Sequence, residues 1–222
     1  MVVEAAGRNA AAAGQSPREQ LPTLVSPAPE PHALYALLQR CTDVVLSLAL
    51  LPAALPLVVV ACLAIVLTTG QLPFLAQRRV GWMGREFTLL KLRTMRNEGE
   101  QQVGFGAKGP DDERITAVGR ILRRTSLDEL PQLLNVLMGQ MTLVGPRPGL
   151  PSEVAEYKPS WLRRLTVKPG LSGLWQVSGR ASLPLQRWMA LDRVYVNRRS
   201  TSFDLLILMR TVAAVVSMRG AW

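Results

Sequence analysis

The stretch that decides the fold is VVLSLALLPAALPLVVVACLAIVL, residues 44–67. It forms most of a 34-residue segment, 44–77, that contains no formally charged side chain. A helix rises about 1.5 Å per residue, so these 24 residues are enough to cross the hydrocarbon core of a bilayer. The segment therefore predicts a protein that is attached to a membrane.

Two features of this stretch leave its topology open. Pro52 and Pro56 lie in its middle, and each lacks the N–H that a helix needs, which favours a break. Basic residues flank both ends, and the positive-inside rule then favours both ends on the cytoplasmic side. These residues are Arg40 before the stretch, where Asp43 partly offsets it, and Arg78, Arg79 and Arg85 after it. A single spanning helix and a re-entrant hairpin over about 40–72 are both compatible with the pattern.

The rest of the composition limits the possible chemistry. The formal charge of +10 predicts a polyanionic partner, such as a phosphorylated substrate, an anionic membrane surface or nucleic acid. Aromatic residues make up only 5%, which argues against base stacking and nucleic acid. Cys41 and Cys62 lie at or in the apolar segment, and His32 is the single histidine, so thiolate metal sites and histidine-based catalysis are disfavoured. Any chemistry should use carboxylates and arginines.

An acidic pair follows a basic run. Asp128 and Glu129 are preceded by Arg114, Arg120, Arg123 and Arg124, with no acid between Arg114 and Asp128. This arrangement suits chemistry on a phosphate. A structural alternative is a helix start, in which Ser126 and Glu129 form a capping box. Pro131 argues against that box, because it would then lie beyond the first turn, and a start one or two residues later fits better.

Several local elements can be predicted around this pair. Residues 130–138 have apolar side chains at helical spacing and predict an amphipathic helix that ends at Gly139. Residues 115–122 predict a short helix and 87–92 a strand, while the glycines between 97 and 112 predict a loop. The apolar run 203–216 contains Asp204 and Arg210, and suits an interfacial helix better than a span, with a buried helix as the alternative.

Further basic residues are candidates for phosphate binding. Arg147 lies between Pro146 and Pro148, which fix the backbone on both sides of it and favour bidentate recognition of an anion. Lys91 lies in the predicted strand and Arg93 follows it, and Arg120 and Arg123 can share one helix face. A solvated basic face is the alternative for each.

Together these motifs carry a resemblance. The chain resembles the bacterial sugar transferases, the small monotopic polyprenyl-phosphate phosphoglycosyl transferases, from about residue 35 to 220. The matching runs, in order, are 77–81, 87–95, 114–120, 125–137, 144–148, 167–180 and 192–196. The agreement of many ordered motifs is far more specific than any one of them.

The resemblance implies a reaction and roles for the residues. The family transfers a sugar phosphate from a UDP-sugar to a polyprenyl phosphate, typically undecaprenyl phosphate, and releases UMP. By similarity, Asp128 is the nucleophile that forms a phosphosugar-aspartyl intermediate, and Glu129 binds Mg²⁺, with Asp128 as a second possible ligand. Arg123 and Arg147 match family arginines that neutralise phosphate charge. Aspartyl-phosphate chemistry needs no histidine, in agreement with the composition.

The resemblance also implies an architecture. We expect an α/β, mostly helical fold, with a Pro-broken re-entrant membrane helix, interfacial amphipathic helices and a compact catalytic domain facing the cytoplasm at the bacterial inner membrane. Residues 1–34, rich in Ala and Pro, predict a disordered tail before a domain over 35–222, whose catalytic part is about 73–222. Pro56 falls at the family's proline, but Leu55 replaces the usual serine and Gln140 a frequent acid.

Two other functional hypotheses remain. A non-catalytic basic membrane module that anchors a glycan-assembly complex would suit the capping interpretation of Asp128 and Glu129. A membrane-tethered nucleic-acid binder would suit the charge but not the scarce aromatics. We expect no nucleic acid partner, while the sugar, the glycan pathway and the oligomeric state, with a homodimer as one option, are left open by the sequence.

Overall fold

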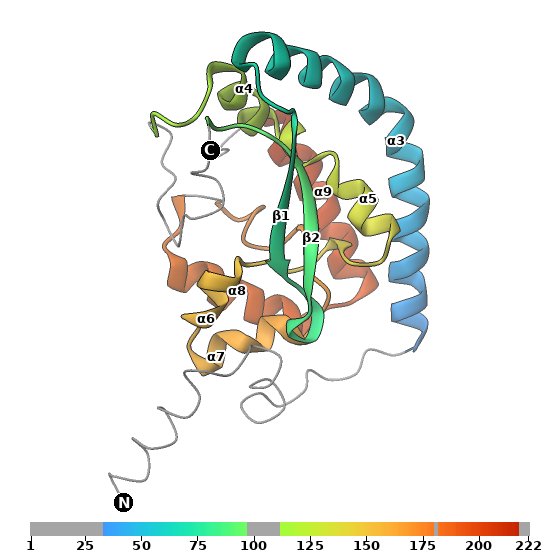
Figure 1. Cartoon of the computed structure of the whole chain (residues 1–222). Coiled ribbons are helices and arrows are strands. Elements are labelled where there is room, and N and C mark those ends of the chain that lie inside the picture. Colours follow the sequence, from blue (N-terminus) through green and yellow to red (C-terminus); the bar gives the residue numbers. More distant parts are fainter. Residues whose placement is uncertain (1–32, 97–111, 180–181, 218–222) are drawn as a thin grey trace, which may run out of the picture.

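A computed structural model describes residues 33–96, 112–179 and 182–217 (Figure 1). The predicted tail up to residue 32 and most of the predicted loop, 97–111, lie outside these residues. The α-helices are α3 Ala33–Thr69, α4 Ala117–Thr125, α5 Gln132–Leu137, α6 Pro151–Ala155, α7 Pro159–Leu162, α8 Leu185–Arg198 and α9 Thr201–Ser217. The strands are β1 Phe74–Val80, β2 Glu86–Leu92, β3 Thr142–Val144 and β4 Gly170–Ser172, and short 3-10 turns are η1 Trp82–Gly84, η3 Leu127–Glu129 and η4 Arg163–Thr166. The described chain is a mostly helical α/β protein, as predicted.

The apolar segment forms the long helix α3. Among the described residues it is the one helix long and apolar enough to cross a membrane. It continues through Pro52 and Pro56 without interruption, so the predicted break is instead a bend near its middle, visible in Figure 1. One stripe is buried against the rest of the molecule, while much of the remaining surface is apolar and exposed. The buried stripe is Asp43, Ser47, Ala54, Ala61 and Ile65.

Both arms of α3 are docked on the globular part. In the first arm, Arg40 donates to the Val136 and Leu137 carbonyls at the end of α5, at 2.7 Å each. Asp43 accepts from the Thr142 hydroxyl and the Leu143 N–H of β3. In the second arm, Ala61 and Ile65 join a small apolar core with residues of β2 and α4. Arg40 and Asp43 of α3 thus face protein and are hydrogen-bonded there, while many apolar groups of the helix face outward. The buried Ser47 hydroxyl has no hydrogen-bond partner among the described residues.

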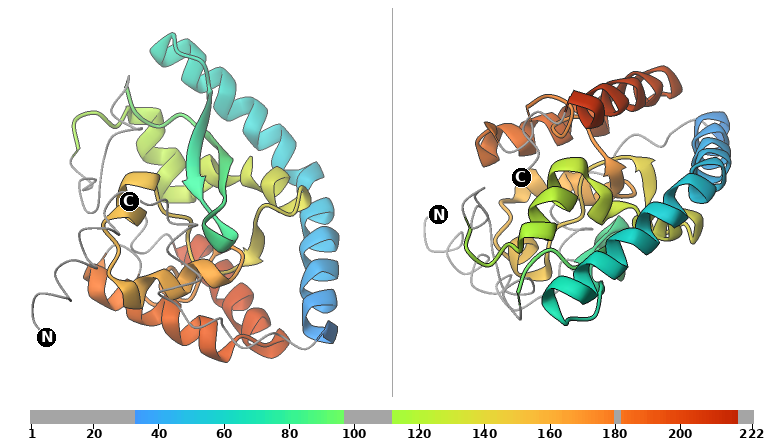
Figure 2. Two further views of the ribbon diagram at one scale, coloured as in Figure 1. Left: turned by 60° about the horizontal axis from the view of Figure 1, so that its bottom comes forward. Right: turned by 90° about the horizontal axis from the view of Figure 1, so that it is seen from above.

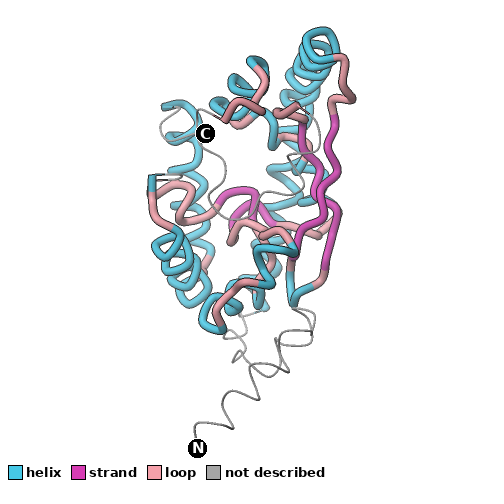
Figure 3. The backbone as a smooth tube through the Cα atoms, turned by 60° about the vertical axis from the view of Figure 1, so that its left-hand side comes forward, coloured by secondary structure: helices cyan, strands magenta, loops and turns pink. Residues whose placement is uncertain are grey.

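The two long strands form an antiparallel hairpin along one side of the molecule (Figure 3). Its inner face is unusual because it is partly charged. Gln77, Arg79 and Lys91 are buried on it, beside Leu75 and Leu89. A buried charge is costly unless other groups bind it, so this face points to a functional site.

The central core lies between α5, α8, α9 and the short parallel pair β3–β4 (Figure 2). The strands approach closely because glycines lie at the crossing: a Cβ on Gly170 would be 2.0 Å from the Gly145 nitrogen. Tyr195 donates from its buried hydroxyl to Val144 of β3 or to Asp204 of α9. These contacts fix the loop that follows β3, which carries Arg147.

The C-terminal helix α9 confirms the predicted helix over 203–216. Asp204 and Ile207 are buried, while Leu205, Leu206, Met209, Val212, Val215 and Val216 are exposed. The N-terminal end of α9 adjoins that of α3, since the Tyr35 hydroxyl donates to Asp204 at 2.9 Å.

Candidate active site

The acidic pair lies in η3, between α4 and α5. Ser126 adopts a left-handed conformation (φ 59°) and makes no capping bond through its side chain. The helix α5 begins at Gln132, after Pro131. It therefore starts later than a Ser126 cap would give, and by more than the one or two residues expected, and the capping box of Ser126 and Glu129 is wrong. The acids are therefore not occupied in starting a helix.

Asp128 is buried, with 9% of its surface exposed. Burial and the adjacent Glu129 carboxylate raise the pKa of Asp128 to about 7, although Lys91, Arg123 and Arg147 act in the opposite direction. A carboxylate with little hydration and nearby cations is well suited to attack a phosphorus atom, because it loses few hydrogen bonds to water.

Glu129 forms an ion pair with Arg147. The Arg147 Nη1 lies 2.6 Å from the Glu129 Oε1, and both side chains are partly exposed. This contact brings together residues 18 positions apart and places the arginine between the two prolines beside the acidic pair. The ion pair uses one Glu129 oxygen, so the second oxygen can bind a ligand.

Two other predicted cations lie near the pair. Arg123, at the end of α4, donates from Nε to the Thr94 hydroxyl at 2.8 Å. Lys91 is buried on the inner face of the hairpin. Both residues lower the pKa of Asp128, so they lie close enough to interact with it electrostatically. The structure thus brings Asp128, Glu129, Arg147, Arg123 and Lys91 together.

The remaining predicted cations lie elsewhere. Arg93 donates from Nε to the Leu72 carbonyl after α3. Arg120 is exposed on α4. The assignment of these two residues to phosphate binding stays a prediction.

A model of the family described as "Bacterial sugar transferase" matches residues 34–218. The chain belongs to the bacterial sugar transferases. This confirms the resemblance drawn from the sequence and the expected enzyme class, the phosphoglycosyl transferases.

Curated relatives of this sugar transferase have specific names. It is 37% identical over 198 residues to the exopolysaccharide production protein ExoY of Sinorhizobium fredii, covering 83% of this chain and 88% of that protein. It is 40% identical over 216 residues to the UDP-glucose:undecaprenyl-phosphate glucose-1-phosphate transferase of Caulobacter vibrioides, covering 93% and 80%. It is 38% identical over 199 residues to the undecaprenyl-phosphate galactose phosphotransferase of Salmonella typhimurium, covering 83% and 42%.

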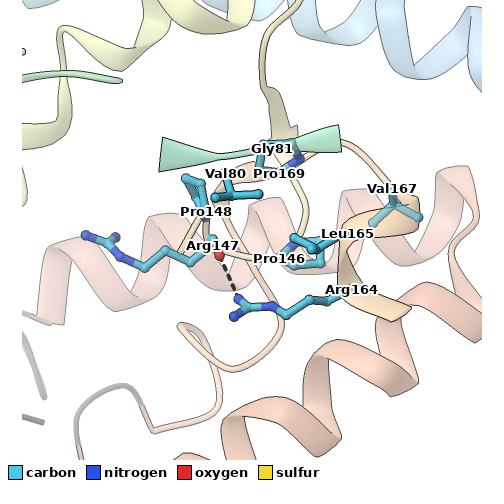
Figure 4. A pocket seen from close by; sticks show the side chains of 9 residues that line it. All are labelled: Val80, Gly81, Pro146, Arg147, Pro148, Arg164, Leu165, Val167 and Pro169. Carbon is cyan, nitrogen blue, oxygen red and sulfur yellow. Dashed lines mark hydrogen bonds between the residues drawn. The ribbon is translucent and has the colours of Figure 1, made fainter. Parts of the chain in front are cut away.

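Sequence reasoning missed two buried arginines of this sugar transferase. Arg79 was predicted to be one of the basic residues beside the membrane segment, but it is buried on the hairpin. Arg164, in η4, donates to the Arg147 carbonyl at 2.6 Å and pairs with Asp192 of α8 at 2.8 Å. In Figure 4, Arg164 reaches this carbonyl across a small crevice under the loop, while the Arg147 side chain extends away from it. The period of two along β1 could have placed Gln77 and Arg79 on one face.

The sequence also did not indicate a structural role for Asn135. It is fully buried in α5 and bonds to the hairpin backbone, accepting from the Leu90 N–H and donating to the Thr88 carbonyl. It donates as well to Gln140 Oε1 at 2.7 Å. Gln140 thus supplies an acceptor at the position where an acid is frequent in the family, and a carboxylate there would accept the same bond.

The acidic pair fits a magnesium ion. Among the described residues no group of three or more His, Cys, Asp or Glu side chains could hold a metal. Two adjacent carboxylates are instead compatible with Mg²⁺, which binds through one or two carboxylates together with phosphate oxygens and water. The raised pKa of Asp128 indicates that a nearby cation would be favourable, since Glu129 adds negative charge beside a buried acid.

Proposed function

We propose that this sugar transferase moves a sugar 1-phosphate from a UDP-sugar to a polyprenyl phosphate and releases UMP. The acceptor and donor classes are supported by the names of relatives that match most of this chain. The observation that carries the proposal is the buried Asp128, which lies beside the Glu129–Arg147 pair with Lys91 and Arg123 in reach.

The reaction is proposed to take two steps on Asp128. An Asp128 carboxylate oxygen attacks the β-phosphorus of the UDP-sugar, and the bond from that phosphorus to the bridging oxygen breaks. UMP leaves with the bridging oxygen, and the sugar phosphate stays on the aspartate. An oxygen of the polyprenyl phosphate then attacks the same phosphorus, which frees the carboxylate and forms a lipid diphosphate sugar. Each step needs no proton donor other than water, because the leaving groups are weakly basic phosphate and carboxylate oxygens.

The cations have distinct proposed roles. Arg147 balances the charge of Glu129 before substrate binds. The guanidinium N–H groups that do not bind Glu129 can donate to the diphosphate. Lys91 and Arg123 lower the pKa of Asp128 and so favour the nucleophilic carboxylate. Mg²⁺, held by Glu129 with Asp128 nearby, would neutralise diphosphate oxygens. These groups stabilise charge that increases on the phosphate oxygens in the transition state.

We also propose that α3 enters and leaves the membrane on the cytoplasmic side. The bend of the helix and the docking of both arms on one globular body support this topology, because a spanning helix would separate its ends by the bilayer. The exposed apolar side chains of α9 support a second contact in the interface. The catalytic part would then face the cytoplasm, beside the phosphate of a lipid acceptor. Reaction of single cysteines with a membrane-impermeant thiol reagent would test this, and labelling of positions before Arg40 from the periplasm would contradict it.

The activity is tested by release of UMP from a panel of UDP-sugars in the presence of undecaprenyl phosphate. We expect the wild type to release UMP with at least one donor and Asp128→Asn to release none. Glu156→Gln is the control, since Glu156 is exposed at the end of α6. Full activity of Asp128→Asn would remove this residue from the nucleophile role, and no UMP from any donor would contradict the proposed function.

A further inference from the structure

The loop that carries Arg147 has few hydrogen-bond donors of its own. Pro146 and Pro148 lack an N–H, so the loop cannot stabilise itself through a regular turn. Its carbonyls must instead be satisfied by other segments, since unpaired buried carbonyls are costly. Pro146, Pro148 and Gly149 are buried, which makes this requirement strict.

Four consecutive carbonyls of the loop accept hydrogen bonds from three other segments, β4, η4 and β1. The Pro146 carbonyl accepts from the Gly170 N–H at 2.9 Å, and the Gly149 carbonyl from the Val80 N–H at 2.9 Å. The two carbonyls between them accept from side chains. Arg164 Nη2 donates to Arg147 at 2.6 Å, and Arg79 Nη1 donates to Pro148 at 3.0 Å.

The two arginines come from opposite sides of the loop and are fixed in turn. Arg79 lies on β1 and is held by Gln77, whose Oε1 accepts from its Nε at 3.2 Å and its Nη2 at 2.7 Å. Arg164 donates to the Tyr157 hydroxyl at 2.6 Å and pairs with Asp192. Their exposed fractions are 8% and 9%, so neither guanidinium is freely hydrated.

Arg79 is the more informative of the two. It donates to neutral acceptors, the side-chain amide of Gln77 and the Pro148 carbonyl, whereas Arg164 pairs with a buried carboxylate. Burial and the nearby charge of Arg147 lower the pKa of Arg79 to about 10. Keeping a second cation beside Arg147 is unfavourable for the fold alone and suggests a role in the site.

We propose that Arg79 and Arg164 are positioning residues that hold the backbone of Arg147 from both sides, so that its side chain is presented to the acidic pair and to the substrate diphosphate. The part of the proposal that concerns the substrate diphosphate rests on the proposed function. The part that concerns the fixed conformation of the loop rests only on the hydrogen bonds described above. Neither arginine is assigned a contact with substrate. Because displacement of a charged group by about 1 Å can cost about 100-fold in rate, a loose loop should be evident in turnover.

The kinetic test is a double-mutant cycle between Arg79→Met and Arg147→Ala. Alone, Arg79→Met should lower kcat/KM for the UDP-sugar by about 10- to 100-fold. In the Arg147→Ala background it should change kcat/KM by less than about threefold, because a residue that acts through Arg147 has nothing left to position. A general loss of stability would reduce both backgrounds equally, and equal losses would overturn the proposal. Arg78→Met is the matched control, because Arg78 is adjacent to Arg79, exposed, and paired with Glu86 on the surface at 3.1 Å. This variant should behave as wild type.

A second readout does not depend on turnover. Hydrogen–deuterium exchange of the segment 145–150 should be faster in Arg79→Met than in Arg78→Met, while exchange in α8 stays the same. Unchanged exchange in segment 145–150 would contradict the proposal even if no UDP-sugar is turned over. A wild type that releases no UMP, with faster exchange in Arg79→Met, would instead contradict the proposed function and leave the hold on the loop supported.

If Arg79→Met does not fold, Arg79→Lys serves the same purpose. Lysine keeps the charge but lacks the guanidinium group that donates to both Gln77 and Pro148. Arg79→Lys should therefore also lose activity and lose protection from hydrogen exchange in the segment 145–150. Full activity and full protection in Arg79→Lys would show that charge alone suffices and would overturn the proposed hold on the loop.

Discussion

Replacing Asp128 with asparagine should make the protein more stable while it removes activity. The pKa of Asp128 is raised in the folded state, so its ionised form is disfavoured by folding. Between about pH 4 and pH 7 the folded protein holds a proton that the unfolded chain releases, and stability falls as the pH rises through this window. Asparagine has no ionisable carboxyl group, so the stability of Asp128→Asn does not fall in this way.

The size of the effect follows from the shift. A rise from 3.8 to about 7 is about three pKa units, and one unit corresponds to about 1.36 kcal/mol. The full penalty in the wild type is therefore about 4 kcal/mol above pH 7 and near zero at pH 4. For a chain of this length, about 4 kcal/mol corresponds to a difference in Tm of about 10 °C.

The assay is thermal unfolding in detergent micelles at several pH values between 5 and 8, with EDTA present so that no divalent cation compensates the acidic pair. The Tm of Asp128→Asn should exceed that of the wild type at pH 8, and the difference should shrink towards pH 5. Glu156→Gln is the control, since Glu156 is exposed at the end of α6. Equal Tm values for wild type and Asp128→Asn at pH 8 would refute the account of a buried, destabilised nucleophile.

Three further changes test other parts of the structure. Millimolar Mg²⁺ should raise the Tm of the wild type at pH 8 more than that of Asp128→Asn, and an equal rise in both would contradict a metal site at the acidic pair. Arg40→Met should lower the free energy of unfolding by about 2 kcal/mol, because it removes two bonds from a charged group to α5 carbonyls, and an unchanged Tm would show that these two bonds do not help to dock α3. Gly119→Ala should destabilise the protein by about 1–3 kcal/mol, because a Cβ would lie 2.0 Å from the carbonyl oxygen of Thr94. It should also reduce UMP release, since the Thr94 hydroxyl binds Arg123. A wild-type Tm and activity would contradict this close contact.

The sequence predicted the features that depend on local pattern. Apolar spacing located α5 and α9, Pro131 placed the start of α5 after the acids, and the uncharged run located α3. The acidic pair, Arg123, Lys91 and Arg147 were also selected, because adjacent acids behind a basic run suit chemistry on a phosphate and two prolines fix the backbone at Arg147. The family resemblance, and not periodicity, supplied the separate roles of Asp128 and Glu129.

What the sequence could not show depends on contacts between distant residues. Arg78 and Arg79 lie on opposite faces of β1, and the packing of the hairpin against the rest of the protein decides which of the two faces is buried. Arg40 was interpreted as a flanking charge that sets topology, whereas it binds carbonyls 96 and 97 residues away. The pairing of Arg164 with the Arg147 carbonyl requires β3 and β4 to lie side by side, which three-residue strands do not reveal.

The most direct test of the central claim is intact-protein mass spectrometry after incubation with an active UDP-sugar and Mg²⁺ but no lipid acceptor. A covalent intermediate on Asp128 predicts a mass increase of one sugar phosphate on the wild type, located on the peptide that contains Asp128. The increase should be absent from Asp128→Asn and lost when undecaprenyl phosphate is added. Release of UMP only when both substrates are present, with no adduct at any time, would contradict a covalent intermediate on Asp128.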